Sequence, residues 1–328
     1  MPDNRQNHQM DLKMFFRLKF PRLMGTSEVP NFDIFDPQVG VDGYCSAIRK
    51  YLFPNSNPFS FSLAAFSFES RTYCKGAVFS RVRGLSPERA KKFLTGSVSV
   101  SDFFPPTAET GKVSVGRFNE EGERKLYLAD HPYVALKERG IEPGEYFLFS
   151  YFALKSDTHF VYADPDGSDF SRILYSLFKS SDERFYGVIR RVYNEYLSYD
   201  SHHGIAYDSV KVNKKQFDTT WGEIKSVTNL AMDEKGFPAA YLRAGWLARC
   251  DENYHPQFLK IFVPVASRKN RLTALAFNGN ESKFESEYDK LNKEIAQMNE
   301  EMKARIRRND FDEVNLNPVK MLPWREVP

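Results

Sequence analysis

The spacing of apolar and polar residues divides the middle of the chain into short strands and helices. Alternating or continuous apolar runs predict strands at 74–84, 124–129, 144–154, 204–212, 237–248 and 257–266. Apolar positions three and four residues apart predict helices at 168–180 and 181–198. The two kinds of element do not alternate regularly, so the sequence favours an α+β fold over a doubly wound sheet.

Capping and turn residues mark where several elements begin and end. Ser86 is a candidate N-cap of a short helix at 86–94, and Asp130 is the predicted N-cap of another helix that Gly140 ends. Gly122 in the polar run "NEEG" predicts a turn with positive φ. Consecutive prolines in 103–112 predict a loop.

Both ends of the chain differ from its middle. Residues 1–70 are predicted to form an N-terminal extension in which Phe59, Phe61 and Leu63 alternate as in a strand. Residues 71–280 are the predicted central domain, and residues 281–328 a C-terminal helix and tail.

The C-terminal segment carries apolar residues at heptad-like spacing. They are Phe284, Tyr288, Leu291, Ile295, Met298, Met302 and Ile306. This seam is typical of a helix that pairs with a partner, which would give a homo-oligomer through residues 282–308, or of a helix docked on the protein's own body. The sequence leaves both alternatives open.

Composition narrows the class of protein without identifying it. The 328 residues are 41% hydrophobic and 15% aromatic with a net charge of +3, which is typical of a folded chain and gives no general argument for a nucleic-acid or membrane surface. Cys45, Cys74 and Cys250 are widely separated, so reduced thiols in a cytoplasmic protein are expected rather than disulfides or zinc. The patchy N-terminal run is predicted to be neither a signal peptide nor a membrane span.

Common catalytic motifs do not occur in the sequence. It contains no GxGxxG, GxxxxGK[ST], HExxH or GxSxG pattern, so standard phosphate loops, zinc proteases and serine hydrolases are not predicted. His202 and His203 are neighbours in a polar segment, which is typical of surface residues, and we predict no metal site.

A smaller set of polar and aromatic residues fits the binding of a dinucleotide. Arg81 or Arg83 together with Arg117 would bind phosphates, and Tyr127 would line the cleft. A fixed carboxylate such as Glu138 suits glycosidic cleavage, because that reaction passes through a positively charged, oxocarbenium-like transition state. NAD carries two phosphates, riboses and a charged leaving base, so NAD is the expected substrate.

Each of these residues also fits a structural role. Arg81 and Arg83 alternate on one strand, so one of them fits a solvated edge. Arg117 could pair with Glu120 or Glu121, and Tyr127 fits a half-buried core ring. Glu138 fits an exposed helix end, where a negative charge opposes the helix dipole.

The residues between 75 and 235 resemble the RES-domain family, which is named for its Arg, Glu and Ser. The segment "VFSRVRG" resembles the family's opening strand, and "GIAYDSVKV" the segment that carries its serine, here Ser209. "TNLAM" at 228–232 resembles the short strand that follows. The most specific likeness is the block 103–138, where the matching residues are Gly116, Arg117, Asn119, Gly122, Leu126, Tyr127, Ala129, Ala135, Leu136 and Glu138.

The resemblance implies a fold related to ADP-ribosyltransferases, with a mixed, bent sheet around an NAD cleft. It implies NAD breakdown with water or phosphate as acceptor, as an NAD glycohydrolase or NAD phosphorylase, with NAD as substrate and no retained cofactor. Toxin members of the family are blocked by a helix-turn-helix antitoxin. The catalytic residues would be Glu138, Arg117 and Ser209, and the substrate-binding residues Arg81, Tyr127 and Asn119.

Within the same cleft, Glu138 would stabilise the transition-state charge, and Ser209 would orient the nicotinamide ribose or its carboxamide. Two alternatives remain open. One is an ADP-ribosyltransferase that modifies a macromolecule, and the other is a catalytically silent module that binds a nucleotide or a protein partner.

Overall fold

The computed structural model describes residues 30–53, 68–107, 109, 111, 113–219, 222–252 and 255–309, with side chains to residue 305. The helices are α2 (Gly40–Leu52), α3 (Pro87–Thr95), α4 (Pro132–Arg139), α5 (Asp169–Lys179), α6 (Tyr186–Tyr196) and α7 (Glu281–Asn309), with short 3₁₀ turns η1 (Val100–Phe103), η2 (Glu183–Phe185) and η3 (Glu234–Ala239). The alternation predicted for Phe59 to Leu63 lies outside the described residues.

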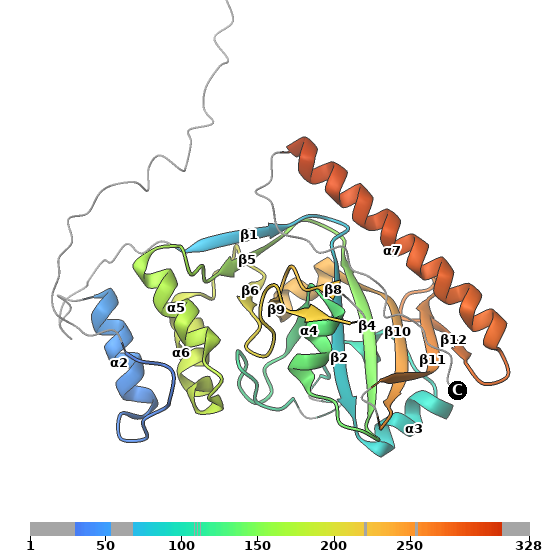
Figure 1. Ribbon diagram of the computed structural model, residues 1–328, viewed down its shortest axis with the longest axis horizontal. Helices are drawn as coiled ribbons and strands as arrows, with labels where there is room; N and C mark the ends of the chain where they lie inside the picture. The colour runs from blue at the N-terminus through green and yellow to red at the C-terminus, as the bar shows by residue number, and fades with distance from the viewer. Residues whose placement is uncertain are drawn as a thin grey trace, which may run out of the picture.

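One ten-stranded sheet forms the centre of the molecule (Figure 1). Its strands, in spatial order, are β1 (Glu69–Tyr73), β5 (Thr158–Tyr162), β6 (Gly204–Asp208), β9 (Thr228–Asp233), β3 (Lys125–Ala129), β2 (Val78–Leu85), β4 (Tyr146–Leu154), β10 (Ala240–Cys250), β11 (Pro256–Pro264) and β12 (Leu272–Ala276). A two-stranded hairpin comprises β7 (Phe217–Asp218) and β8 (Gly222–Glu223). Among the described strands of the large sheet, β5 and β6 pair in parallel and the other neighbours pair antiparallel, so the prediction of a mixed α+β fold is confirmed.

The sheet has a weak joint between β2 and β3. The pair Ser80–Ala129 is the one ladder position that these strands share, and the Ser80 hydroxyl donates to the Ala129 carbonyl at 3.0 Å. By contrast, β2 pairs with β4 over eight positions, and β3 pairs with β9 over five. The backbone edges of β2 and β3 therefore do not form a continuous ladder, which leaves room for a pocket between the two halves of the sheet.

Different helices cover the two halves. Near β1, helices α2, α5 and α6 lie together (Figure 1) and bury Ile48, Leu174 and Val188 in a cluster that also includes Ile205 of β6. The helix α2 belongs to the segment that was predicted to be an extension, and it packs on α6 within this cluster.

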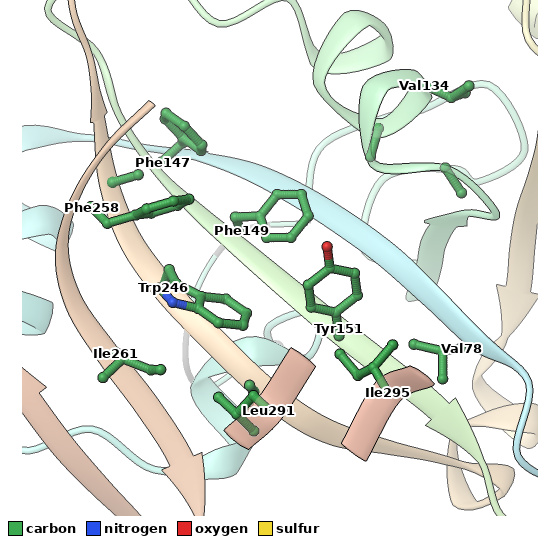
Figure 2. Close-up of a cluster of buried hydrophobic side chains, with 14 of the residues drawn as sticks. Val78, Val134, Phe147, Phe149, Tyr151, Trp246, Phe258, Ile261, Leu291 and Ile295 are labelled. Atoms are coloured by element: carbon green, nitrogen blue, oxygen red, sulfur yellow. The ribbon is translucent and has the colours of Figure 1, made fainter. Parts of the chain in front are cut away.

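At the other end of the sheet, α7 packs on the half that contains β4 and β10. Figure 2 shows Leu291 and Ile295 of α7 close to Tyr151 and Trp246 of the sheet. The seam residues Phe284, Leu291 and Ile295 are at most 1% exposed. The seam up to Met302 thus packs on the protein's own body, and a homo-oligomer through residues 282–308 would need another face of this helix.

Local signals explain most of the boundaries near the pocket. Ser86 caps α3 by accepting from the Arg89 backbone N–H, Gly122 has φ +83°, and Gly140 ends α4 with φ +59°, all as predicted. The predicted cap Asp130 was wrong, because His131 caps α4 through its Nδ1 atom, 3.1 Å from Tyr133 N. Asp130 instead continues the β3–β9 pairing, since its N–H donates to Thr228 O.

Candidate active site

A pocket of about 650 Å³ occupies the joint between β2 and β3. Five of the six predicted site residues line it: Arg81, Arg117, Asn119, Tyr127 and Glu138. They come from β2, the loop before β3, β3 itself and α4, so four separate structural elements converge on one cavity. Arg83 lines the same wall as Arg81.

Glu138 lies in the last turn of α4, and two side chains fix one of its oxygens. The Ser209 hydroxyl donates to Oε1 at 2.5 Å, and Asn229 Nδ2 donates to the same atom at 3.0 Å. Within the described residues, Oε2 accepts no hydrogen bond from another side chain or from the backbone. The carboxylate is therefore held in place while one oxygen remains available to a ligand.

Ser209 lies behind the pocket wall and contacts the site indirectly, through its hydrogen bond to Glu138. Its side chain is fully buried, it does not line the pocket, and its hydroxyl accepts from Lys211 N at 3.1 Å and Val212 N at 3.0 Å. The segment leaves β6 at Asp208, one residue earlier, so the predicted strand 204–212 is too long. In this geometry Ser209 positions the carboxylate, whereas a direct contact with the ribose or carboxamide stays a prediction.

Asn229 was not selected from the sequence. It lies on β9, which pairs with β3 on one side and β6 on the other, and that pairing brings its amide to Glu138. Its one visible signal was a polar residue inside the apolar run "TNLAM".

The Gly-Arg-x-Asn block forms a braced loop. The Tyr127 hydroxyl donates to Asn119 Oδ1 at 2.9 Å and accepts from Phe118 N at 3.0 Å. A Cβ on Gly116 would overlap both the Asn119 side chain and the Tyr127 hydroxyl, so only glycine fits there. Burial raises the pKa of Tyr127 far above its usual range, which keeps this hydroxyl protonated.

Arg117 is largely engaged by the protein. Its guanidinium donates to Phe178 O at 2.5 Å and Ser180 O at 3.3 Å, and it lies 4.9 Å from the centre of the Tyr186 ring. Glu120, one of its two anticipated partners, pairs with Arg190 at 2.8 Å instead. Arg117 therefore anchors the loop after α5 and presents only part of its guanidinium to the pocket.

Positive charge is concentrated along β2. Burial, followed by the charge of Arg83, lowers the pKa of Arg81 to about 9. Burial, followed by the charge of Arg89, lowers the pKa of Arg83 to about 10. Arg81 and Arg83 both remain charged at neutral pH, so this wall of the pocket attracts anions.

A buried carboxyl group behind α4 makes stability depend on pH. Asp130 is 3% exposed, and its Oδ2 accepts from Ser226 while Oδ1 lacks a partner. Burial is the main cause that raises the pKa of this carboxyl to about 7. Because an unfolded aspartate titrates near 3.9, the folded state binds the proton more tightly and loses stability as pH rises towards 7.

We expect Asp130→Asn to remove this pH dependence. Between pH 5 and pH 8 the wild type should lose about 2–3 kcal/mol of unfolding free energy relative to the variant, because the amide at position 130 of the variant carries no charge at either pH. Urea unfolding of both proteins at the two pH values measures the difference. If the unfolding free energies of the wild type and the variant differed by the same amount at pH 5 and pH 8, Asp130 would not change its charge in this interval.

Neither a family model nor a curated protein nor a solved structure matches the chain. Within the described residues, no group of three or more His, Cys, Asp or Glu side chains is arranged to hold a metal ion. In the same part of the chain, every helix is too short or too polar to cross a membrane.

Proposed function

We propose that this protein degrades NAD by cleaving the bond between nicotinamide and ribose, with water or phosphate as acceptor. The observation that carries the proposal is the Glu138 carboxylate, fixed by Ser209 and Asn229 in the wall of a pocket that also contains several arginines. The likeness of residues 75–235 to the RES-domain family supports the same activity.

The chemistry needs few protein groups. When the C1′–N bond breaks, the bonding electrons neutralise the pyridinium nitrogen, so nicotinamide leaves without a proton from a general acid. Positive charge then develops on the ribose, and a fixed carboxylate stabilises it by electrostatic attraction. The acceptor oxygen forms the new bond to C1′ and releases its proton to solvent when water is the acceptor.

The fold, role and location that we propose follow the same resemblance. A mixed sheet with a pocket at an interrupted joint is compatible with an ADP-ribosyltransferase-like fold. Three free, buried cysteines fit a reducing compartment such as the cytoplasm. The activity would suit a toxin or defence effector, for which a helix-turn-helix antitoxin is the proposed inhibitor.

The test is incubation of the purified protein with NAD, with and without inorganic phosphate. We expect free nicotinamide, together with ADP-ribose when water is the acceptor or its 1″-phosphate when phosphate is, and mass spectrometry distinguishes these products. Label from NAD on a macromolecule would indicate an ADP-ribosyltransferase instead. Calorimetric NAD binding without any turnover would indicate a silent binding module and would refute the proposed reaction.

A further inference from the structure

Two arginines at the rim of the pocket have no partner within the described part of the chain. Arg89 of α3 and Arg139 of α4 both line the cavity, and neither side chain makes a hydrogen bond or ion pair there. Arg139 lies directly over Gly84, where a Cβ would overlap its guanidinium. The missing side chain at Gly84 thus leaves room for the Arg139 guanidinium against the backbone of β2.

Arg83 completes this cationic rim, defined here as Arg83, Arg89 and Arg139. Its guanidinium donates to Asp102 O at 2.6 Å and to Phe104 O at 3.3 Å, which fixes its position, while its buried Nε has no partner. The charge of Arg89 contributes to the lowered pKa of Arg83, and Arg139 lies over Gly84, the neighbour of Arg83. Like charges along one wall of a pocket repel each other, and an anion bound between them would reduce that repulsion.

Two residues of the rim lie at the boundary of two cavities, whereas Arg139 lines only the first of them. Arg83, Arg89, Pro105 and Pro106 line both the pocket that contains Glu138 and a second pocket of about 790 Å³. Phe104 and Phe237 contribute partly buried aromatic rings to the second pocket, and the Arg124 guanidinium lies 5.2 Å from the centre of the Phe237 ring. Flat aromatic and guanidinium surfaces of this kind bind nucleobases by stacking.

From this arrangement we infer that the cationic rim binds the pyrophosphate of the dinucleotide, with nicotinamide riboside in the Glu138 pocket and adenosine in the second pocket. The inference rests on the proposed function. Of the predicted phosphate ligands it keeps Arg83, and it replaces Arg81 and Arg117 with Arg89 and Arg139. Arg117 donates to backbone carbonyls and Arg81 to Phe103 O at 3.0 Å, whereas Arg89 and Arg139 have all their donors free within the described residues.

Calorimetry with ADP tests the rim without depending on turnover. Arg89→Ala and Arg139→Ala should each weaken ADP binding at least about tenfold, because each removes charge-assisted hydrogen bonds to phosphate. Neither side chain holds the fold together, and equal melting temperatures would verify this. Arg172→Ala is the matched control, since Arg172 is exposed, pairs with Asp169 and lies outside both pockets.

A bulky side chain in the wall of the second pocket tests whether adenosine binds there. Ser101 is exposed at its wall, and Ser101→Trp should weaken ADP binding to the level of inorganic pyrophosphate while nicotinamide mononucleotide binds as before. Unchanged ADP affinity in either arginine variant, or equal loss of ADP and nicotinamide mononucleotide in Ser101→Trp, would overturn the inference.

Parallel turnover measurements separate the two proposals. If ADP binds through the rim but NAD releases no nicotinamide, the proposed reaction fails and the nucleotide site remains. If NAD is consumed but the arginine variants keep the wild-type KM and ADP affinity, the rim assignment fails and the reaction remains.

Discussion

Glu138→Gln is expected to reduce nicotinamide release by on the order of 10³-fold while the fold and NAD binding persist. The substitution keeps the shape of the side chain and leaves an amide oxygen that can accept from Ser209 and Asn229 as the carboxylate does. The substitution removes the negative charge that would stabilise the developing oxocarbenium ion.

Single-turnover release of nicotinamide measures the chemical step directly, and calorimetry with NAD measures binding. Glu285→Gln serves as the matched control, because Glu285 is an exposed glutamate on α7, outside the pocket. An unimpaired Glu138→Gln enzyme would reject the catalytic role of this carboxylate. Loss of NAD binding with retained fold would instead place Glu138 in substrate recognition.

Local sequence signals were sufficient for most individual elements. The run of strand-forming residues before Gly84 and the apolar run that ends at Ala129 predicted β2 and β3, because β-propensity acts within a few residues. The cap at Ser86 and the turn at Gly122 were predicted for the same reason, since each depends on its own backbone conformation. Asp130 was assigned wrongly because its burial next to Thr228 depends on a strand a hundred residues later.

The sequence predicted most of the residues that line the candidate site, but not the contacts between them. The spacing of Gly116, Asn119 and Tyr127 identified a compact block, and the structure shows why: the three fit together in one braced loop. The contact between Asn229 and Glu138 requires β9 to insert between β3 and β6, which no local pattern specifies. The position of Arg139 over Gly84 likewise follows from helix packing, not from spacing.

The C-terminal seam is another case in which sequence does not specify a contact. Heptad spacing indicates that a helix has an apolar face, but it does not indicate what covers that face. Here the sheet covers it. The ion pair between Arg305 and Asp157, at 2.8 Å, ties the far end of α7 to the turn before β5. Arg243 of β10 forms a second such tie with Glu294.

Leu291→Ala should therefore destabilise the fold by about 3 kcal/mol without changing the mass of the protein in solution. Leu291 is 1% exposed in the cluster that contains Tyr151 and Trp246, so the truncation leaves a cavity inside the chain's own core. The neighbouring exposed residue supplies the control, and Asn292→Ala should change the unfolding free energy by no more than about 0.5 kcal/mol.

Urea unfolding and light scattering on the same samples distinguish a docked helix from a helix that pairs with a partner. If α7 contributed its seam to an oligomer, Leu291→Ala would lower the measured mass, and the stability of the wild type would rise with protein concentration. A helix docked on its own sheet gives the opposite result: a constant mass, and a loss of stability that is the same at every concentration.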